Sequence, residues 1–285
     1  MWQRLGALVD PIPLLQSAVN KKWPNIARAS AAAIKTNQKL EAIFKGLSST
    51  DASVVVFGSL ARKEWTSKSD VDWTLLVDGQ ADPQHLEIAQ EVASRLTKAG
   101  FQSPGATGIF GNMTFSHDLV QKIGGREDTN ENTTRRVLLL QESAAFGKAD
   151  AHDRVLRLII SRYLKDDLGL RFGSLPYKVP RFLLNDIVRY WRTITLDFVE
   201  KQRGQAGHGF GLRNAKLRMS RKLIFATGML ACFSCELLCS REARNELLKE
   251  HSTVKMEEHL RAFIGFTPLE VLAIFFLVEN QKEDC

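Results

Sequence analysis

The chain has 285 residues, 44% of them hydrophobic and 25% charged, a composition typical of a globular protein with one large domain or two modest ones. The 39 Lys and Arg residues outnumber the 32 Asp and Glu residues, so the formal net charge is +7, which argues against cationic partners and favours polyanionic ones. No apolar run approaches the roughly 20 residues of a membrane helix, and we expect no membrane association.

Two features of the sequence predict a cytoplasmic protein. The first residues lack the basic start, apolar middle and small-residue cleavage site of a signal peptide. Four cysteines, three of them clustered at Cys232, Cys235 and Cys239, do not form the framework of a disulfide-stapled chain of this length. Their spacing places these three on one helical face, where we expect core packing.

The first half of the chain mixes helices and strands. Short β-branched runs that end at glycine or aspartate predict buried strands, and apolar residues at helical spacing predict the helices between them. The expected elements are a helix at 25–47, strands at 53–57 and 71–77, a helix at 83–98 and a strand at 111–116.

From Asp128 onward the pattern becomes helical. Asp128 and Glu131 have the spacing of a capping box, which predicts a helix start. The expected helices lie near 133–146, 152–166, 178–202, 212–238, 241–250, 255–264 and 268–279, with loops at 169–177 and 204–211. The predicted fold class is α/β of the α+β type, a small mixed sheet followed by a helical bundle. We place domain boundaries at 1–47 (helical segment), 48–147 (catalytic core) and 148–285 (helical domain).

The sharpest motif lies between the two predicted strands. The first strand ends in Gly58-Ser59, where a sharp turn lets backbone amides and a hydroxyl approach phosphate oxygens. Asp70 and Asp72 precede the second strand, and because side chains alternate along a strand, both carboxylates point to the same side. Such a pair binds hard divalent cations, and two metal ions can hold both oxygens of an in-line phosphoryl displacement.

This combination of Gly-Ser and Asp-x-Asp resembles the signature of the polymerase-β-like nucleotidyltransferase superfamily over residues 54–77. The resemblance implies that Gly58 and Ser59 bind the triphosphate and that Asp70 and Asp72 are catalytic metal ligands. It implies two Mg²⁺ ions, with Mn²⁺ as an alternative, and a nucleoside triphosphate such as ATP as donor. Arg62, in the short connection, is a further candidate for the phosphates.

A third carboxylate, commonly on a neighbouring strand, completes the metal site or activates the acceptor in such enzymes. Asp118, just after the strand expected at 111–116, is the first candidate, and Asp128 and Glu142 compete with it. A helix cap or a solvated loop acid explains Asp118 equally well.

Two further patterns refine the hypothesis. Residues 133–147 are similar to the helix that follows the catalytic sheet in bacterial signal-protein uridylyltransferases and related nucleotidyltransferases, although no ligand-sensing domain accompanies it here. Lys216 and Ser220 are four residues apart on a predicted helix and so share a face, where they could bind a triphosphate. A solvated basic face explains the same residues.

The sequence therefore predicts an enzyme that moves a nucleotidyl group from a nucleoside triphosphate to a hydroxyl or phosphate acceptor and releases pyrophosphate. The basic charge favours RNA or a nucleotide as the acceptor over a cationic small molecule. The alternative is a catalytically silent module of the same fold that binds nucleotide or a partner protein. The oligomeric state is left open.

Overall fold

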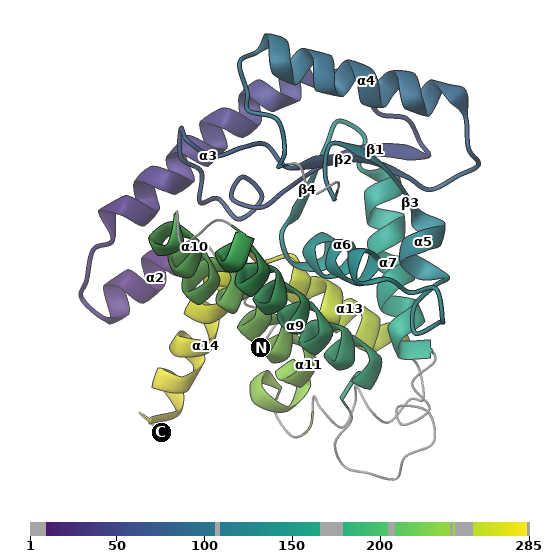
Figure 1. Cartoon of the computed structure of the whole chain (residues 1–285). Coiled ribbons are helices and arrows are strands. Elements are labelled where there is room, and N and C mark those ends of the chain that lie inside the picture. The colour runs from purple at the N-terminus through teal and green to yellow at the C-terminus, as the bar shows by residue number, and fades with distance from the viewer. Residues whose placement is uncertain are drawn as a thin grey trace. The chain divides into compact units, whose positions relative to one another are not determined.

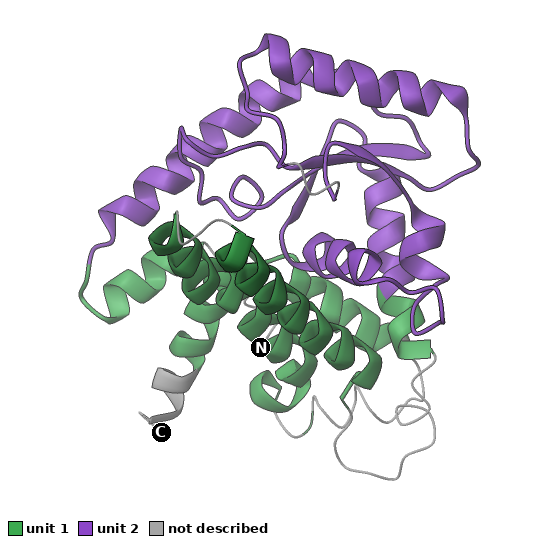
Figure 2. Ribbon diagram, viewed as in Figure 1, with its two compact units in different colours: residues 1–21, 160–285 green, residues 22–159 purple. Residues whose placement is uncertain are grey.

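The computed structural model describes residues 10–105, 109–165, 179–204, 209–239, 242 and 253–283. The chain divides into two compact units (Figure 2): residues 22–159 form unit 2, and residues 1–21 with 160–285 form unit 1. These limits differ from the domain boundaries expected at 47/48 and 147/148, which stay a prediction.

Unit 2 is built on a four-stranded mixed sheet (Figure 1) with the order β3-β2-β1-β4. Strand β1 is antiparallel to both of its neighbours, β2 and β4, whereas β2 and β3 are parallel. The strands are β1 (Ala52–Phe57), β2 (Trp73–Val77), β3 (Asn112–Phe115) and β4 (Ser143–Phe146). All residues of β1 and β2 are buried, as their continuous apolar sequences predict.

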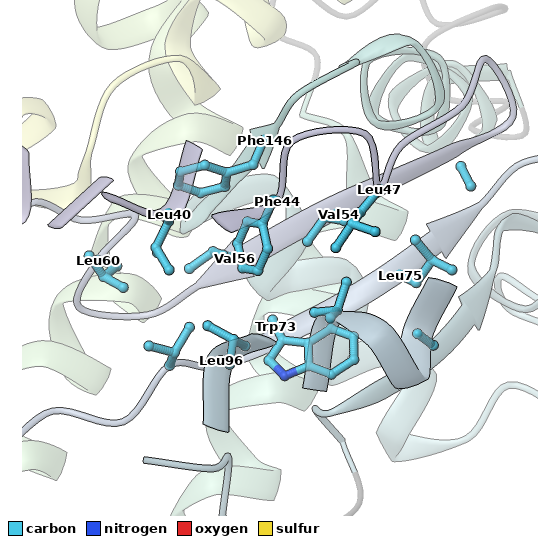
Figure 3. Close-up of a cluster of buried hydrophobic side chains, with 14 of the residues drawn as sticks. Leu40, Phe44, Leu47, Val54, Val56, Leu60, Trp73, Leu75, Leu96 and Phe146 are labelled. Atoms are coloured by element: carbon cyan, nitrogen blue, oxygen red, sulfur yellow. The ribbon is translucent and has the colours of Figure 1, made fainter. Parts of the chain in front are cut away.

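Helices α3 (Pro24–Ile43) and α4 (Pro83–Lys98) cover one face of this sheet. Trp73 and its alternate neighbours on β2 pack there with the matching residues of β1, and the rings of Phe44 and Phe146 meet edge to face at 5.6 Å (Figure 3). Burial of these large side chains gives the greatest part of the folding energy, about 1.5–3 kcal/mol for each. This core fixes which side chains of β1 and β2 must point to the other face.

The opposite face packs against α6 (Asn130–Gln141) and α7 (Asp150–Lys165), with the short α5 (Ser116–Val120) beside them. His152 of α7 lies at the centre of this contact. Its Nε2 is 2.8 Å from Oγ of Ser143, and its backbone amide donates to Oγ of Ser53 at 3.3 Å. The two serines belong to neighbouring strands, so His152 ties α7 to both β1 and β4.

Two expectations for this segment are wrong. The helix expected at 133–146 ends at Gln141, and residues 143–146 form β4 instead, because pairing with β1 outweighs the weak strand propensity of Ser-Ala-Ala-Phe. The N-cap of α6 is Thr129, whose side chain accepts from the amide of Asn132, and not Asp128. Asp128 is instead buried in an ion pair. The expected small mixed sheet with helices is confirmed.

Unit 1 is helical throughout its described residues. Its hydrophobic core joins α11, α13 and α14 through residues such as Leu238, Phe263 and Ile274. Cys232 and Cys235 are buried, and burial raises the pKa of both thiols to about 12, in keeping with the expected packing role. Cys239, expected on the same helical face, is instead the half-buried residue that ends α11 in an extended conformation. The helices are α2 (Pro11–Ala18), α9 (Arg181–Gly204), α10 (Phe210–Lys216), the π-helix η1 (Leu217–Arg221), α11 (Lys222–Leu238), α13 (Thr253–Ile264) and α14 (Pro268–Glu283).

The helix expected at 212–238 is thus divided by a π-helical segment. The expectations for 169–177 and for most of 241–250 fall outside the described residues. In the described part of the chain no single helix is both long and apolar enough to cross a membrane, although the bent pair Val254–Ile264 and Pro268–Val278 meets these criteria when taken together.

Candidate active site

The turn that follows β1 is shaped by a glycine in a conformation that other residues rarely adopt. Gly58 is buried and has φ of +72°, in the left-handed region. A Cβ atom added there would lie 3.4 Å from Oδ2 of Asp72. Glycine therefore meets two needs at once, the backbone turn and the close approach of the carboxylate.

The five residues after Gly58 form a single helical turn that ends in a Schellman motif. The amide of Glu64 donates to the carbonyl of Ser59 at 2.7 Å, and the amide of Lys63 donates to that of Leu60 at 3.1 Å. Lys63 occupies the position that usually requires glycine, with φ of +61°. This strained residue defines where the turn ends.

The first amides of this turn are available to a ligand. Among the described residues, the amides of Ser59, Leu60 and Ala61 have no hydrogen-bond partner. They follow Gly58, and the carbonyl of Gly58 already accepts from the amide of Arg62 at 2.9 Å. Amides at the start of a helical turn favour anions, so the turn can bind phosphate oxygens.

Asp70 and Asp72 lie in the extended segment directly before β2. The amide of Phe57 donates to the carbonyl of Asp72 at 2.8 Å, which continues the pairing of β1 with β2. Val71 and Trp73 are buried in the core, while Asp72 is half-buried and Asp70 is exposed. This alternation agrees with two carboxylates that point away from the core, and that of Asp72 lies close to Gly58.

These two carboxylates have the oxygen donors that Mg²⁺ prefers. In the described part of the chain no group of three or more His, Cys, Asp or Glu side chains is arranged to hold a metal ion. Mg²⁺ usually binds through one or two carboxylates and completes its six ligands with water and substrate phosphates. The residues present therefore fit an ion that is shared with a bound triphosphate.

Arg62, expected at the phosphates, makes ion pairs with two acids. Its Nε lies 2.9 Å from Oε2 of Glu64, and its Nη1 contacts Oε2 of Glu142. Burial lowers the pKa of Arg62, but the charges of Glu142 and Glu64 outweigh this effect, so the pKa lies above its ordinary value. The carbonyl of Glu142 also accepts from the amide of Gly58 at 3.2 Å.

The structure separates the three candidates for the third carboxylate. Glu142 borders the Gly58 turn, as just described. Asp128 lies in a buried pair in which its two oxygens accept from Nη1 and Nη2 of Arg136 at 2.8 and 2.7 Å. Asp118 lies on α5 and pairs with Lys122 at 2.6 Å.

Strand direction places Asp118 far from Asp72. Asp72 precedes β2, Asp118 follows β3, and the two strands are parallel, so the two acids lie at opposite ends of the sheet. Neither β3 nor β1, the two neighbours of β2, carries an acidic residue. On β2 itself, the hydroxyl of Thr74 donates to the carbonyl of Asn112 on β3 at 2.7 Å, so a threonine and not an acid lies between these two strands.

Lys216 and Ser220 belong to unit 1, at the junction of α10 and η1. Lys216 is exposed, and the hydroxyl of Ser220 donates to the carbonyl of Lys216 at 3.3 Å. Both roles expected for them stay predictions. Sequence reasoning missed the pairing of Arg62 with Glu142 and Glu64, and no local pattern could signal a contact between Arg62 and Glu142, which are 80 residues apart.

A comparison with known protein families matches one segment of the chain. Residues 37–99, which include β1, the turn, Asp70, Asp72, β2 and α4, match the family described as a nucleotidyltransferase domain. This segment is consistent with the polymerase-β-like superfamily and confirms the resemblance predicted from Gly58, Ser59, Asp70 and Asp72. The finer similarity to uridylyltransferases has no support from it. No curated protein and no solved structure is significantly similar to the chain.

Proposed function

We propose that the protein is a Mg²⁺-dependent nucleotidyltransferase that transfers a nucleoside monophosphate from a nucleoside triphosphate to an acceptor. The observation that carries the proposal is the approach of the Asp72 carboxylate to Gly58, within a segment that matches the nucleotidyltransferase domain. The proposed metal ligands and phosphate-binding amides then follow β1 and precede β2, which is the same end of this antiparallel pair, as phosphoryl transfer requires.

In this reaction the acceptor oxygen attacks the α-phosphorus, the bond from the α-phosphorus to the bridging oxygen of the β-phosphate breaks, and pyrophosphate leaves. The proton of a hydroxyl acceptor passes to a site carboxylate or to solvent. Mg²⁺ bound between Asp70, Asp72 and the triphosphate would neutralise the charge that develops on the phosphate oxygens. The amides of Ser59, Leu60 and Ala61 would orient the triphosphate.

The experiment compares wild type with Asp70→Asn/Asp72→Asn in the presence of labelled nucleoside triphosphates, Mg²⁺ and cell extract. Loss of both carboxylate charges should lower product formation by about 10³-fold or more, within the range observed when transition-state charge stabilisation is removed. Glu87→Gln/Glu127→Gln removes two exposed carboxylates from unit 2 and should retain activity. Equal product from wild type and the Asp70/Asp72 variant would refute the mechanism.

A catalytically silent module is the alternative, and one observation favours it: no third carboxylate is arranged with Asp70 and Asp72 among the described residues. The two candidates differ in turnover only. A nucleotide at 100 times its dissociation constant raises folding stability by about 2.7 kcal/mol, which a thermal melt detects. The silent module would be selected by two results together. Nucleotide would raise the melting temperature only with Mg²⁺ and not in Asp70→Asn/Asp72→Asn, and wild type would form no labelled product.

For the acceptor we propose RNA or another nucleotide, because the excess positive charge lies in unit 1. Unit 1 contains 22 Lys and Arg residues against 16 Asp and Glu, while unit 2 contains 17 against 16. Residues 209–235 include five cations and no acid, and Lys216, Arg218 and Lys222 are exposed. Backbone phosphates bind such cations and release counterions.

Single-stranded RNA should therefore bind with an affinity that falls steeply with salt, and Arg218→Glu/Lys222→Glu should weaken this binding by about tenfold or more at low salt. Fluorescence anisotropy of labelled RNA measures both effects. Melting shifts with Mg²⁺ and ATP should stay as in wild type. Equal RNA affinity of the variant and wild type would remove this surface as the acceptor site.

A further inference from the structure

We propose that Arg62 and Glu142 are positioning residues whose buried ion pair holds the Gly58–Ser59 turn in the geometry that receives a triphosphate. The inference rests on the proposed function, because it concerns the same turn. Sequence reasoning placed Arg62 at the phosphates and Glu142 among the candidate metal ligands or bases. Their contacts assign both a different task.

Glu142 connects two segments that are distant in the sequence. It is the residue between α6 and β4, so its backbone is fixed by the pairing of β4 with β1. Its carbonyl accepts from the amide of Gly58, at the beginning of the turn, and its carboxylate contacts Arg62, four residues later. Glu142, directly before β4, therefore contacts both ends of the turn, Gly58 through its carbonyl and Arg62 through its carboxylate.

The charges around Arg62 also favour a positioning role. The side chains of Arg62 and Glu142 are only 10% and 6% exposed, and Glu64 supplies a second carboxylate on the Nε side. A guanidinium between two carboxylates carries no surplus positive charge for a triphosphate. Its fixed fork geometry instead suits the task of holding two backbone segments at a set spacing.

The backbone of the turn is strained next to the ion pair. Lys63, with φ of +61°, lies directly after Arg62, and a non-glycine residue is disfavoured in this left-handed region. The surrounding structure must hold such a residue in place. The ion pair is next to Lys63 and supplies that restraint. Without it, the amides of Ser59 to Ala61 would lose their common orientation.

The test is a double-mutant cycle on nucleotide affinity, measured by calorimetry with Mg²⁺ and ATP well below the melting temperature. We expect Arg62→Met and Glu142→Leu each to raise the dissociation constant about tenfold, because each breaks the buried contact between Arg62 and Glu142 and leaves one buried charge without its counter-charge across the turn. Arg62→Met/Glu142→Leu, in which apolar groups replace the pair, should return to within about threefold of wild type.

Direct ligand contacts predict the opposite outcome. If Arg62 touches phosphate or Glu142 touches the metal ion, the double variant binds no better than the weaker single variant, and the proposal is overturned. Unchanged affinity in both single variants, with only lower melting temperatures, overturns it as well. The matched control is the solvent-accessible pair Glu91–Arg95 on α4, whose replacement by Leu and Met should leave affinity unchanged.

The same data separate this inference from the proposed function. If wild type binds ATP but forms no product with any acceptor, the transfer activity fails while the affinity cycle still decides on Arg62 and Glu142. If the cycle shows no rescue but Asp70→Asn/Asp72→Asn still abolishes product, the positioning role alone fails. If wild type binds none of the four nucleoside triphosphates, both proposals are overturned.

Discussion

Two buried arginine–carboxylate pairs in unit 2 have the same chemistry and different surroundings. Arg136 and Asp128 are 0% and 1% exposed, and both lie in or beside a single helix, α6. Arg62 and Glu142 are 80 residues apart in the chain, keep slight exposure, and border the turn with the unpartnered amides of Ser59 to Ala61. The first pair stabilises one helix, whereas the second joins a turn to a strand edge.

This difference shows why an acid cannot be assigned from its type alone. Asp128 and Glu142 were equal competitors as the third carboxylate, since both are acids downstream of the Asp-x-Asp motif. Burial and pairing separate them, because Asp128 is enclosed by Arg136 while Glu142 lies beside Gly58. The predictions that follow test this separation.

The largest expected effect is on the Arg136–Asp128 pair. Asp128→Ala removes the carboxylate that both Nη atoms of Arg136 contact and leaves the guanidinium charge buried without this counter-charge, which should lower the free energy of unfolding by about 3–5 kcal/mol. For a unit of this size the melting temperature should fall by about 10–17 °C. Calorimetric melts measure the loss. The dissociation constant for Mg²⁺ and ATP, measured on folded protein, should not change, and a tenfold rise would erase the distinction between the two pairs.

Acid pH should lower the free energy of unfolding through His152, which links α7 to β4. Burial lowers the pKa of His152, and the neighbouring Asp153 offsets this only in part. Below the ordinary histidine pKa of about 6.5 the unfolded chain takes up a proton before the folded chain does, so stability falls as the pH falls through this range. The contribution is fully present above pH 6.5.

His152→Gln removes this titration and should flatten the dependence of the melting temperature on pH below about pH 6.5. Ser143 keeps a hydrogen-bonding neighbour in this variant, so the fold should survive. Melts over a pH series make the comparison. If the melting temperature of the variant falls with pH as steeply as that of wild type, other groups cause the acid sensitivity, and the titration of His152 does not weaken the contact between α7 and β4.

A smaller effect of opposite sign is expected at Lys63. Lys63→Gly relieves the left-handed strain at the end of the turn and should raise stability by up to about 1 kcal/mol, although the more flexible unfolded glycine offsets part of the gain. Chemical denaturation measures the change. Lys35→Gly, at an exposed position within the regular helix α3, is the control and should destabilise by a similar amount. Destabilisation by Lys63→Gly would show that the strain argument is unsound.

Sequence patterns predicted the part of the site that depends on local spacing. Gly58, Asp70 and Asp72 follow from a strand, a turn and the alternation of side chains, and the strand and helix positions of residues 52–98 were close to those observed. Strand β4 and the Arg62–Glu142 pair depend on contacts between distant segments. Ser143 to Phe146 become a strand because β1 offers a free edge, and no local propensity reports that.

The smallest expected effect concerns Asp118, the acid that the sequence favoured as the third carboxylate. Its side chain is 40% exposed, and its pairing with Lys122 is of the surface type worth less than about 1 kcal/mol. Because Asp118 follows β3 whereas Asp72 precedes the parallel strand β2, we expect Asp118→Asn to retain turnover and nucleotide affinity within about twofold. Steady-state kinetics beside Asp70→Asn and Glu142→Gln make the measurement. A loss of about 10²-fold in kcat for Asp118→Asn alone would restore it as a catalytic acid and would require a site that draws on both ends of the sheet.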